Sequence, residues 1–411
     1  MIWILISEHV SLPVSSIQYP RFSHSPAGRL NHNKQMRINQ PQLIDSLIDS
    51  TLREGEQTPN VLFADEDKHN IIDGLCRIGV DEIELGVAAP TKTSLPRLVK
   101  EAKKRTAGLC RLSLWCRCKA EDIAFAATCS PDLLALSIPV SDQHIRERLG
   151  KDRAWISRTL ASSIQQALAA GIPAVSVGME DASRADMDFL LATAKIAEQH
   201  GAVRIRLADT VGICSPARIT TLVQTLKEAV PLLSLGVHCH NDFGMATANS
   251  IAALEAGADS LDATVLGLGE RAGNCRLEEV IGYLAFVLGE KRYHPEFLPE
   301  LCRLVAETAG RDIADNHPLV GSAIFTCESG LHQHGLAVNP NIYEPYAPER
   351  VGGTRQLHFG EKTGARAVQM QLHKAGLRLD EMQIKDLVSR IRSGGQVLNQ
   401  EQLLRFAVEC C

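Results

Sequence analysis

The sequence has few aromatic residues and no excess of positive charge. Phe, Trp and Tyr make up 4% of its 411 residues, and the formal net charge is −5. Surfaces that bind nucleic acid or anionic lipid need clustered Lys and Arg, and single-stranded nucleic acid also needs aromatic rings for base stacking. We therefore expect no nucleic acid and no membrane among the partners. The 45% hydrophobic content is typical of a globular protein with a full core.

Long apolar runs and paired cysteines are also missing. The longest stretch without a charge, residues 159–179, is interrupted by Ser, Gln, Gly and Pro, so it predicts no membrane span. The opening MIWILISEHV lacks the basic flank of a signal peptide. The 12 cysteines include no Cys-x-x-Cys pair, and we interpret them as reduced thiols of a cytoplasmic protein.

Residues 1–44 are predicted to be a disordered N-terminal extension. They are polar, contain Pro, Ser, Asn and basic residues, and show no periodicity. Met36 lies just before the patterned sequence begins, so catalysis is not expected to need residues 1–35.

From residue 45 the sequence alternates between short apolar strands and amphipathic helices. The predicted strands lie at residues 47–52, 81–87, 109–116, 133–140, 174–179, 204–210, 233–240 and 260–267. Eight strand-helix units predict a (β/α)8 TIM barrel, and the Gly-x-Gly-x-x-Gly turn of a doubly wound sheet is absent. The alternation ends near residue 320. We thus expect a catalytic barrel at 45–320 and a smaller, mainly helical C-terminal subdomain at 321–411 that covers or completes the active site.

A TIM barrel builds its active site at the C-terminal ends of its strands. Polar and ionisable residues follow five of the predicted strands: Arg53, Glu54, Glu180, Asp181, Asp209, Thr210, His238, His240, Glu270, Arg271 and Asn274. His238 and His240 are two apart on a strand, so their side chains point to the same side. A single histidine at a strand end is usually a packed residue, but two imidazoles with Glu54 from a nearby strand predict a three-ligand metal site.

Four motifs at these strand ends resemble a known family. DSTLREGEQ, ADTVG, HCHNDFG and GLGERAGN, in this order, are similar to the metal-dependent aldolase-like barrels that include isopropylmalate synthase, homocitrate synthase and hydroxymethylglutaryl-CoA lyase. The similarity covers about residues 45–290 and resumes in FTCESGLHQHG at 325–335. Because a long regulatory domain is absent, the chain looks most like the short homocitrate synthases associated with nitrogenase-cofactor assembly.

The resemblance implies a role for each matching residue. The implied ligands of a divalent cation (Mg, Mn or Zn) are Glu54, His238, His240 and Asn274. The implied substrate-binding residues are Arg53, which holds the 2-oxo acid, with Gln57 and Thr210. The implied catalytic residues are Arg53, Glu180 in an acid-base network, and His332 as a candidate base from outside the barrel.

The implied activity is that of an acyltransferase, which condenses acetyl-CoA with 2-oxoglutarate and water to give homocitrate and CoA. The resemblance also implies a homodimer in which the C-terminal domain reaches the neighbouring barrel. Alternatives are the same condensation on another 2-oxo acid, giving isopropylmalate or citramalate, a hydroxymethylglutaryl-CoA-type lyase, and a barrel that has lost catalysis. Three positions depart from the family pattern: Cys327, His334 and Lys362 stand where similar synthases often have His, Asp and His.

Overall fold

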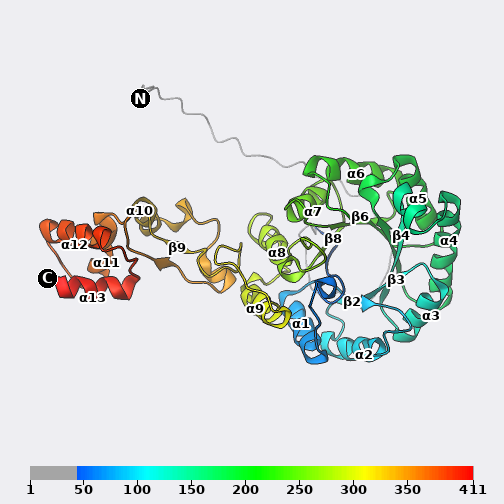
Figure 1. The fold of residues 1–411 in the computed structure, drawn as a ribbon, viewed down its shortest axis with the longest axis horizontal. Coiled ribbons are helices and arrows are strands. Elements are labelled where there is room, and N and C mark those ends of the chain that lie inside the picture. Colours follow the sequence, from blue (N-terminus) through cyan, green and yellow to red (C-terminus); the bar gives the residue numbers. More distant parts are fainter. Residues whose placement is uncertain (1–43, 411) are drawn as a thin grey trace, which may run out of the picture. The chain divides into compact units, whose positions relative to one another are not determined.

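The computed structural model describes residues 44–410, and within them eight parallel strands close into a barrel (Figure 1). Each strand hydrogen-bonds to the next, and β1 pairs with β8 to complete the ring. The strands are β1 (Ser46–Asp49), β2 (Glu82–Val87), β3 (Arg111–Arg117), β4 (Leu133–Pro139), β5 (Val175–Glu180), β6 (Arg204–Asp209), β7 (Ser234–Cys239) and β8 (Ser260–Ala263). The predicted TIM barrel is confirmed, and each strand overlaps its predicted range, although β1 and β8 end earlier than predicted.

One helix follows each strand and lies on the outside of the barrel (Figure 1). These helices are α1 (Asp65–Ile78), α2 (Leu95–Thr106), α3 (Ala120–Cys129), α4 (Arg153–Ala169), α5 (Met187–Gln199), α6 (Pro216–Ala229), α7 (Ala246–Glu255) and α8 (Leu277–Phe286). Three begin at a side-chain cap, since Asp152, Asp186 and Ser215 each accept a hydrogen bond from the backbone N–H three residues on. These caps satisfy backbone donors that the first helical turn leaves unpaired.

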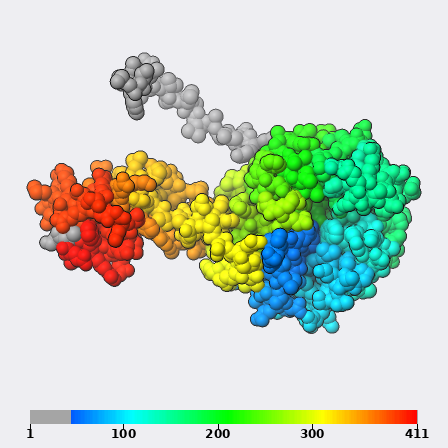
Figure 2. Space-filling model, in the orientation of Figure 1, coloured from blue at the N-terminus to red at the C-terminus, as the bar shows by residue number. Residues whose placement is uncertain are grey.

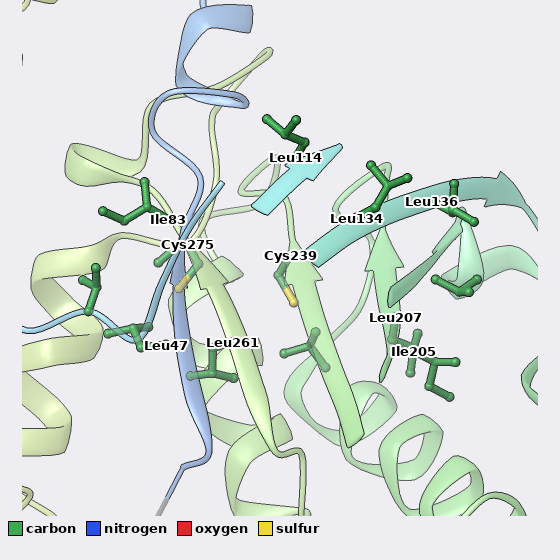
Figure 3. Packing of buried hydrophobic residues seen from close by; sticks show 14 of the residues in the cluster. Leu47, Ile83, Leu114, Leu134, Leu136, Ile205, Leu207, Cys239, Leu261 and Cys275 are labelled. Carbon is green, nitrogen blue, oxygen red and sulfur yellow. The ribbon is translucent and has the colours of Figure 1, made fainter. Parts of the chain in front are cut away.

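The apolar core lies between the strands and the helices. Figure 3 shows members of this layer, among them Leu47, Ile83, Leu134, Ile205 and Leu261, all at most 1% exposed. Because side chains alternate along a strand, the neighbouring residues of these positions face the inside of the barrel. The strand residues between these apolar positions therefore line the interior of the barrel.

The barrel interior contains two layers of buried charge. Arg204 of β6 donates to Glu82 of β2 through two hydrogen bonds of 2.8 and 3.0 Å. Two residues further along the same strands, Arg206 contacts Glu84 at 3.2 Å and Asp262 of β8 at 2.7 Å. β2 and β6 are four places apart in a ring of eight, so these ion pairs cross the interior. The second layer lies closer to the C-terminal ends of the strands, directly beneath the candidate site.

The chain continues beyond the barrel with α9 (Leu298–Ala309), which packs against α1 (Figure 1 and Figure 2). The remaining elements are β9 (Thr326–Cys327), α10 (Gly330–Val338), β10 (Gln356–Leu357), α11 (Ala365–Lys374), α12 (Glu381–Ser393) and α13 (Gln400–Cys410). A second hydrophobic cluster forms here around Phe359, Val368, Leu387 and Leu403, separate from that of the barrel.

Two further predictions concern the N-terminal extension and membrane-spanning helices. The predicted disordered extension, residues 1–44, falls outside the described residues except for Ile44. Within residues 44–410, no helix combines the length and the apolar content needed to cross a membrane.

Candidate metal centre and active site

The structure brings Glu54, His238 and His240 together at the C-terminal end of the barrel. Glu54 lies in the turn after β1, where its backbone N–H donates to Ser50 at 2.7 Å. His238 is in β7 and His240 follows that strand directly. Ligand atoms of the three side chains lie within 4.8 Å of one another, and all three residues are at most 7% exposed. A metal site requires this convergence, although the metal-binding role itself stays a prediction.

The two imidazoles approach each other through their Nε2 atoms. Nε2 of His238 lies 3.3 Å from Nε2 of His240 and 3.6 Å from Oε1 of Glu54, and the rings are nearly perpendicular, with an interplanar angle of 85°. A cation bound between these atoms would receive two nitrogen ligands and one oxygen ligand, with further positions open for water or substrate.

Asp262 determines the orientation of His238. Its Oδ2 lies 3.1 Å from Nδ1 of His238, so this carboxylate accepts the Nδ1 proton and leaves the Nε2 lone pair directed at Glu54 and His240. Burial lowers the pKa of His238, while Asp262 opposes that effect only in part. For His240, burial and the proximity of His238 and Arg271 lower the pKa to about 3. Both imidazoles are therefore neutral near pH 7, as metal ligands must be.

Buried polar atoms without partners support the fit of a cation. Oε2 of Glu54 and Oδ1 of Asn274 are buried and accept no hydrogen bond from the described residues. Burial of such oxygens without a partner is costly, and a divalent cation would compensate both. Carboxylate, amide and imidazole donors are suitable ligands for Mg, Mn or Zn.

The loop after β8 holds Asn274 beside His240. The backbones of His240 and Asn274 form an isolated antiparallel bridge, and the Asn274 amide group donates to the Leu268 carbonyl at 2.8 Å. Gly273 has φ of +87°, and a Cβ there would lie 2.0 Å from the Gly267 carbonyl oxygen. Only glycine fits at this position. The motif GLGERAGN therefore shapes the loop that presents the Asn274 oxygen.

Arg53 lies next to the candidate ligands. Its Nε donates to Glu84 at 2.5 Å, it also contacts Glu54, and its guanidinium lies 5.7 Å from the centre of the Trp115 ring. Burial favours a raised pKa for Glu84, but Arg53, Arg206 and a 2.7 Å hydrogen bond from Ser50 lower it well below its ordinary value. Arg53 is thus a buried cation whose position is fixed by an ionised carboxylate.

The other predicted barrel residues lie on adjoining strand ends. Thr210 follows β6, and its hydroxyl oxygen accepts a 2.8 Å hydrogen bond from the Asp181 N–H. Glu180 ends β5, accepts a 2.7 Å hydrogen bond from Ser137 and pairs with Arg148. Gln57 is exposed in the 3₁₀ turn η1 (Gly55–Gln57). Among the described interactions none joins these three residues to the candidate metal ligands directly.

His332 is not part of the group that the barrel assembles. It is exposed on α10, and its ring packs 4.4 Å from the ring of Tyr343. In the described part of the chain it makes no recorded contact with Glu54, His238 or His240. Its role as a base at the site therefore stays a prediction.

The three departures from the family pattern lie close together in the C-terminal region. Cys327 is in β9 and His334 is on α10. The backbone N–H of Lys362 donates to Glu328 at 3.3 Å, and its carbonyl accepts from the Gly330 N–H at 3.2 Å. These contacts place Lys362 beside the start of α10.

Four residues of the site were not predicted: Glu84, Trp115, Arg206 and Asp262. A signal for two of them was present, because EIELGV and RIRLAD alternate charged and apolar residues within strands that a parallel barrel buries on both faces. A charge at every second position of a buried strand indicates an ionic barrel interior.

The fold and the site together define a class: a TIM barrel with a candidate divalent-metal centre at the C-terminal ends of its strands. The chain belongs to the HMGL-like family, which it matches over residues 45–301. Residues 319–397 match a second description, homocitrate synthase post-HMGL domain-like. The resemblance stated from the motifs is confirmed.

Known proteins agree with this assignment. The chain is 40% identical to the homocitrate synthase of Frankia alni over 362 residues, which are 88% of this chain and 99% of that protein. It is 37% identical to 2-isopropylmalate synthase 2 of Caldanaerobacter subterraneus over 358 residues, 84% of this chain and 89% of that protein. The expectation of an acyltransferase-type enzyme is confirmed at the level of the family.

A solved structure supports the fold alone. The hydroxymethylglutaryl-CoA lyase of Pseudomonas aeruginosa superimposes with a TM-score of 0.57 at 18% identity and covers 66% of this chain and 96% of that one.

Proposed function

We propose that this chain catalyses a metal-dependent Claisen condensation of acetyl-CoA with a 2-oxo acid and water. The preferred oxo acid in this proposal is 2-oxoglutarate, so the products are homocitrate and CoA, and homocitrate serves assembly of the nitrogenase iron-molybdenum cofactor. The observation that carries the proposal is the convergence of Glu54, His238 and His240 next to the buried cation Arg53.

The barrel residues supply binding and orientation. A divalent cation, when bound, supplies a Lewis acid that polarises the keto carbonyl of the oxo acid. Arg53 offers a second positive charge to the substrate carboxylate and to the oxyanion that develops. The Thr210 oxygen already accepts from Asp181, so its hydrogen is free to donate to the substrate. Gln57 contributes a further polar contact from η1.

Two residues are assigned to proton transfer. His332 removes a methyl proton from acetyl-CoA, and the enolate carbon then attacks the keto carbon, forming the new C–C bond while the C=O π bond opens to an alkoxide that takes up a proton. Glu180, held by Ser137 and Arg148, organises the acid-base network. Water then cleaves the C–S bond of the thioester. Exposure of His332 on α10 is consistent with a homodimer in which this region completes the site of the second subunit, as the resemblance implies.

The identity of the oxo acid is the most specific claim of the proposal. The relatives divide between homocitrate and isopropylmalate synthases at similar identity. The match of residues 319–397 to a homocitrate synthase domain favours 2-oxoglutarate. Isopropylmalate or citramalate synthesis is the second candidate, with the same barrel chemistry and a different oxo acid.

The C-terminal region also argues against a lyase. The lyase structure is covered almost completely, yet it accounts for only 66% of this chain. The remaining part has its own hydrophobic cluster and the post-HMGL match. We accordingly propose the boundaries 45–320 for the barrel and 321–411 for the C-terminal subdomain.

We also propose a cytoplasmic location, which follows from the interpretation of the cysteines as reduced thiols.

The test is release of CoA thiol from acetyl-CoA by purified protein. Each assay would contain a divalent metal and one of 2-oxoglutarate, 2-oxoisovalerate, pyruvate, oxaloacetate or glyoxylate. Release that depends on 2-oxoglutarate and stops with a chelator supports homocitrate synthesis. Preference for another oxo acid keeps the mechanism and changes the substrate. No release with any of the five contradicts the condensation.

A further inference from the structure

Arg206 lies between two buried carboxylates beneath the candidate metal centre. Its guanidinium contacts Asp262 at 2.7 Å and Glu84 at 3.2 Å, and the residue is 3% exposed. Each carboxylate has a second partner in the site. Arg206 therefore joins two hydrogen-bonded branches that end at different functional side chains.

The first branch ends at a candidate metal ligand. Asp262 uses the same oxygen, Oδ2, to contact Arg206 and Nδ1 of His238, the latter at 3.1 Å. The guanidinium fixes this oxygen, and the oxygen in turn fixes the orientation of the imidazole. A partner of this kind on the far nitrogen of a ligating histidine sets the direction of the metal-binding lone pair.

The second branch ends at the candidate substrate cation. Glu84 contacts Arg206 through Oε1, while its Oε2 accepts from Arg53 and from Ser50. Without Arg206, Glu84 and Asp262 would lose the cation that separates them inside the barrel, and each would be free to turn toward its remaining partner.

We infer that Arg206 is a positioning residue that couples the His238 side of the metal centre to the Arg53 side of the oxo-acid site. This inference rests on the proposed function for its second branch, because the role of Arg53 in binding an oxo acid belongs to that proposal. The first branch depends only on metal binding by Glu54, His238 and His240.

The barrel offers a matched control two residues away. Arg204 is on the same strand and the same interior face, is also 3% exposed, and forms a similar buried ion pair with Glu82 of the same partner strand. Among the described interactions it contacts neither Arg53 nor the candidate metal ligands. Arg204→Met thus removes a buried cation of the same strand that is hydrogen-bonded to neither branch.

The experiment compares Arg206→Met with Arg204→Met in the full-length protein. Binding of Co²⁺ would be followed by visible absorption, and unfolding temperature and the KM for the oxo acid would be measured in parallel. Both variants are expected to lose stability. Only Arg206→Met is expected to weaken Co²⁺ binding, roughly 10- to 100-fold, and to raise KM for the oxo acid. Equal Co²⁺ affinity in the two variants would overturn the inference.

Conservative variants keep the test decisive if Arg206→Met does not fold. Arg206→Lys keeps the charge but loses the planar fork that reaches both carboxylates, and Asp262→Asn removes the negative charge that holds both Arg206 and Nδ1 of His238. Each is expected to weaken Co²⁺ binding, and the double variant is expected to lose less than the sum of the two. Additive effects, or unchanged affinity, would contradict the coupling.

Failure of the proposed function gives a different result. If the wild-type protein releases no thiol with any oxo acid, while Co²⁺ binding still separates Arg206→Met from Arg204→Met, the condensation is wrong and the positioning role through His238 stands. A wild-type protein that binds no Co²⁺ would overturn both.

Discussion

Nε2 of His238 and Nε2 of His240 lie 3.3 Å apart, each on a ring whose pKa is lowered by burial. The His238 proton is on Nδ1, where Asp262 accepts it, so its Nε2 lone pair is directed at the second ring. Two neutral imidazoles arranged in this way, beside a carboxylate, form a candidate chelating group. Residues of this group, such as His240, should hold metal, whereas His332 should act only on substrate.

Substitution of His240 and His332 is expected to give opposite results for metal content. His240→Ala removes a candidate ligand, so both bound metal and turnover should be lost. His332 is on α10, outside the barrel, and is not one of the three candidate ligands. His332→Ala should therefore abolish turnover while metal is retained. Metal analysis of the two purified variants, alongside thiol release, checks this. Retention of metal by the first or its loss from the second would reverse the assigned roles.

The lowered pKa values predict how many protons metal binding displaces. Neutral imidazole is the ligand form, so a group with an ordinary pKa must lose its proton when metal binds at pH 6. Two histidines with a pKa of 6.5 would release about 1.5 protons at that pH. With a pKa of about 3, His240 is already neutral, and His238 is shifted in the same direction. Calorimetric titration in buffers of different ionisation enthalpy should find fewer than one proton, and a release above one would contradict the burial effect.

Gly273→Ala is expected to damage the metal centre through the backbone. A Cβ at this position would lie 2.0 Å from the Gly267 carbonyl, so the loop must move and carry Asn274 with it. Gly257 is the control, because its φ of +102° is also positive but a Cβ there meets nothing within 4 Å. Gly257→Ala should cost only about 1–2 kcal/mol of unfolding free energy. Co²⁺ affinity should fall in Gly273→Ala alone, and an equal loss in both would show that the loop geometry is unimportant.

Phe359→Ala is expected to unfold the C-terminal region without releasing metal from the barrel. Phe359 is fully buried in the second hydrophobic cluster, and removal of such a side chain costs about 3–5 kcal/mol. Limited proteolysis should cut after residue 320 while Co²⁺ binding persists. Met382→Ala, at an 80% exposed position of α12, is the control and should resist the protease like the wild type. Loss of metal from Phe359→Ala would contradict independent cores.

The sequence predicted the strands well because each carries its own local pattern. The convergence of Glu54 with His238 and His240 also followed from strand order, since a closed barrel makes β1 a near neighbour of β7. The partners of Glu84 and Arg206 could not be predicted in the same way. Their alternation was visible, but which cation meets which carboxylate depends on the register across the closed barrel. His332 is different again, since among the described residues its recorded contact is with Tyr343 and not with the barrel site, so its catalytic role stays a prediction.

The ionic interior has a consequence for how the barrel assembles. Glu82 and Glu84 are in β2, whereas their guanidinium partners are in β6, 122 residues later in the chain. A half-barrel ending at β4 would lack both of these guanidinium groups, leaving Glu84 with Arg53 and Glu82 with the 3.5 Å contact of Arg111. A half-barrel beginning at β5 would keep the pair of Arg206 with Asp262 but would leave Arg204 without Glu82. Both charge layers are therefore complete only when the ring has closed.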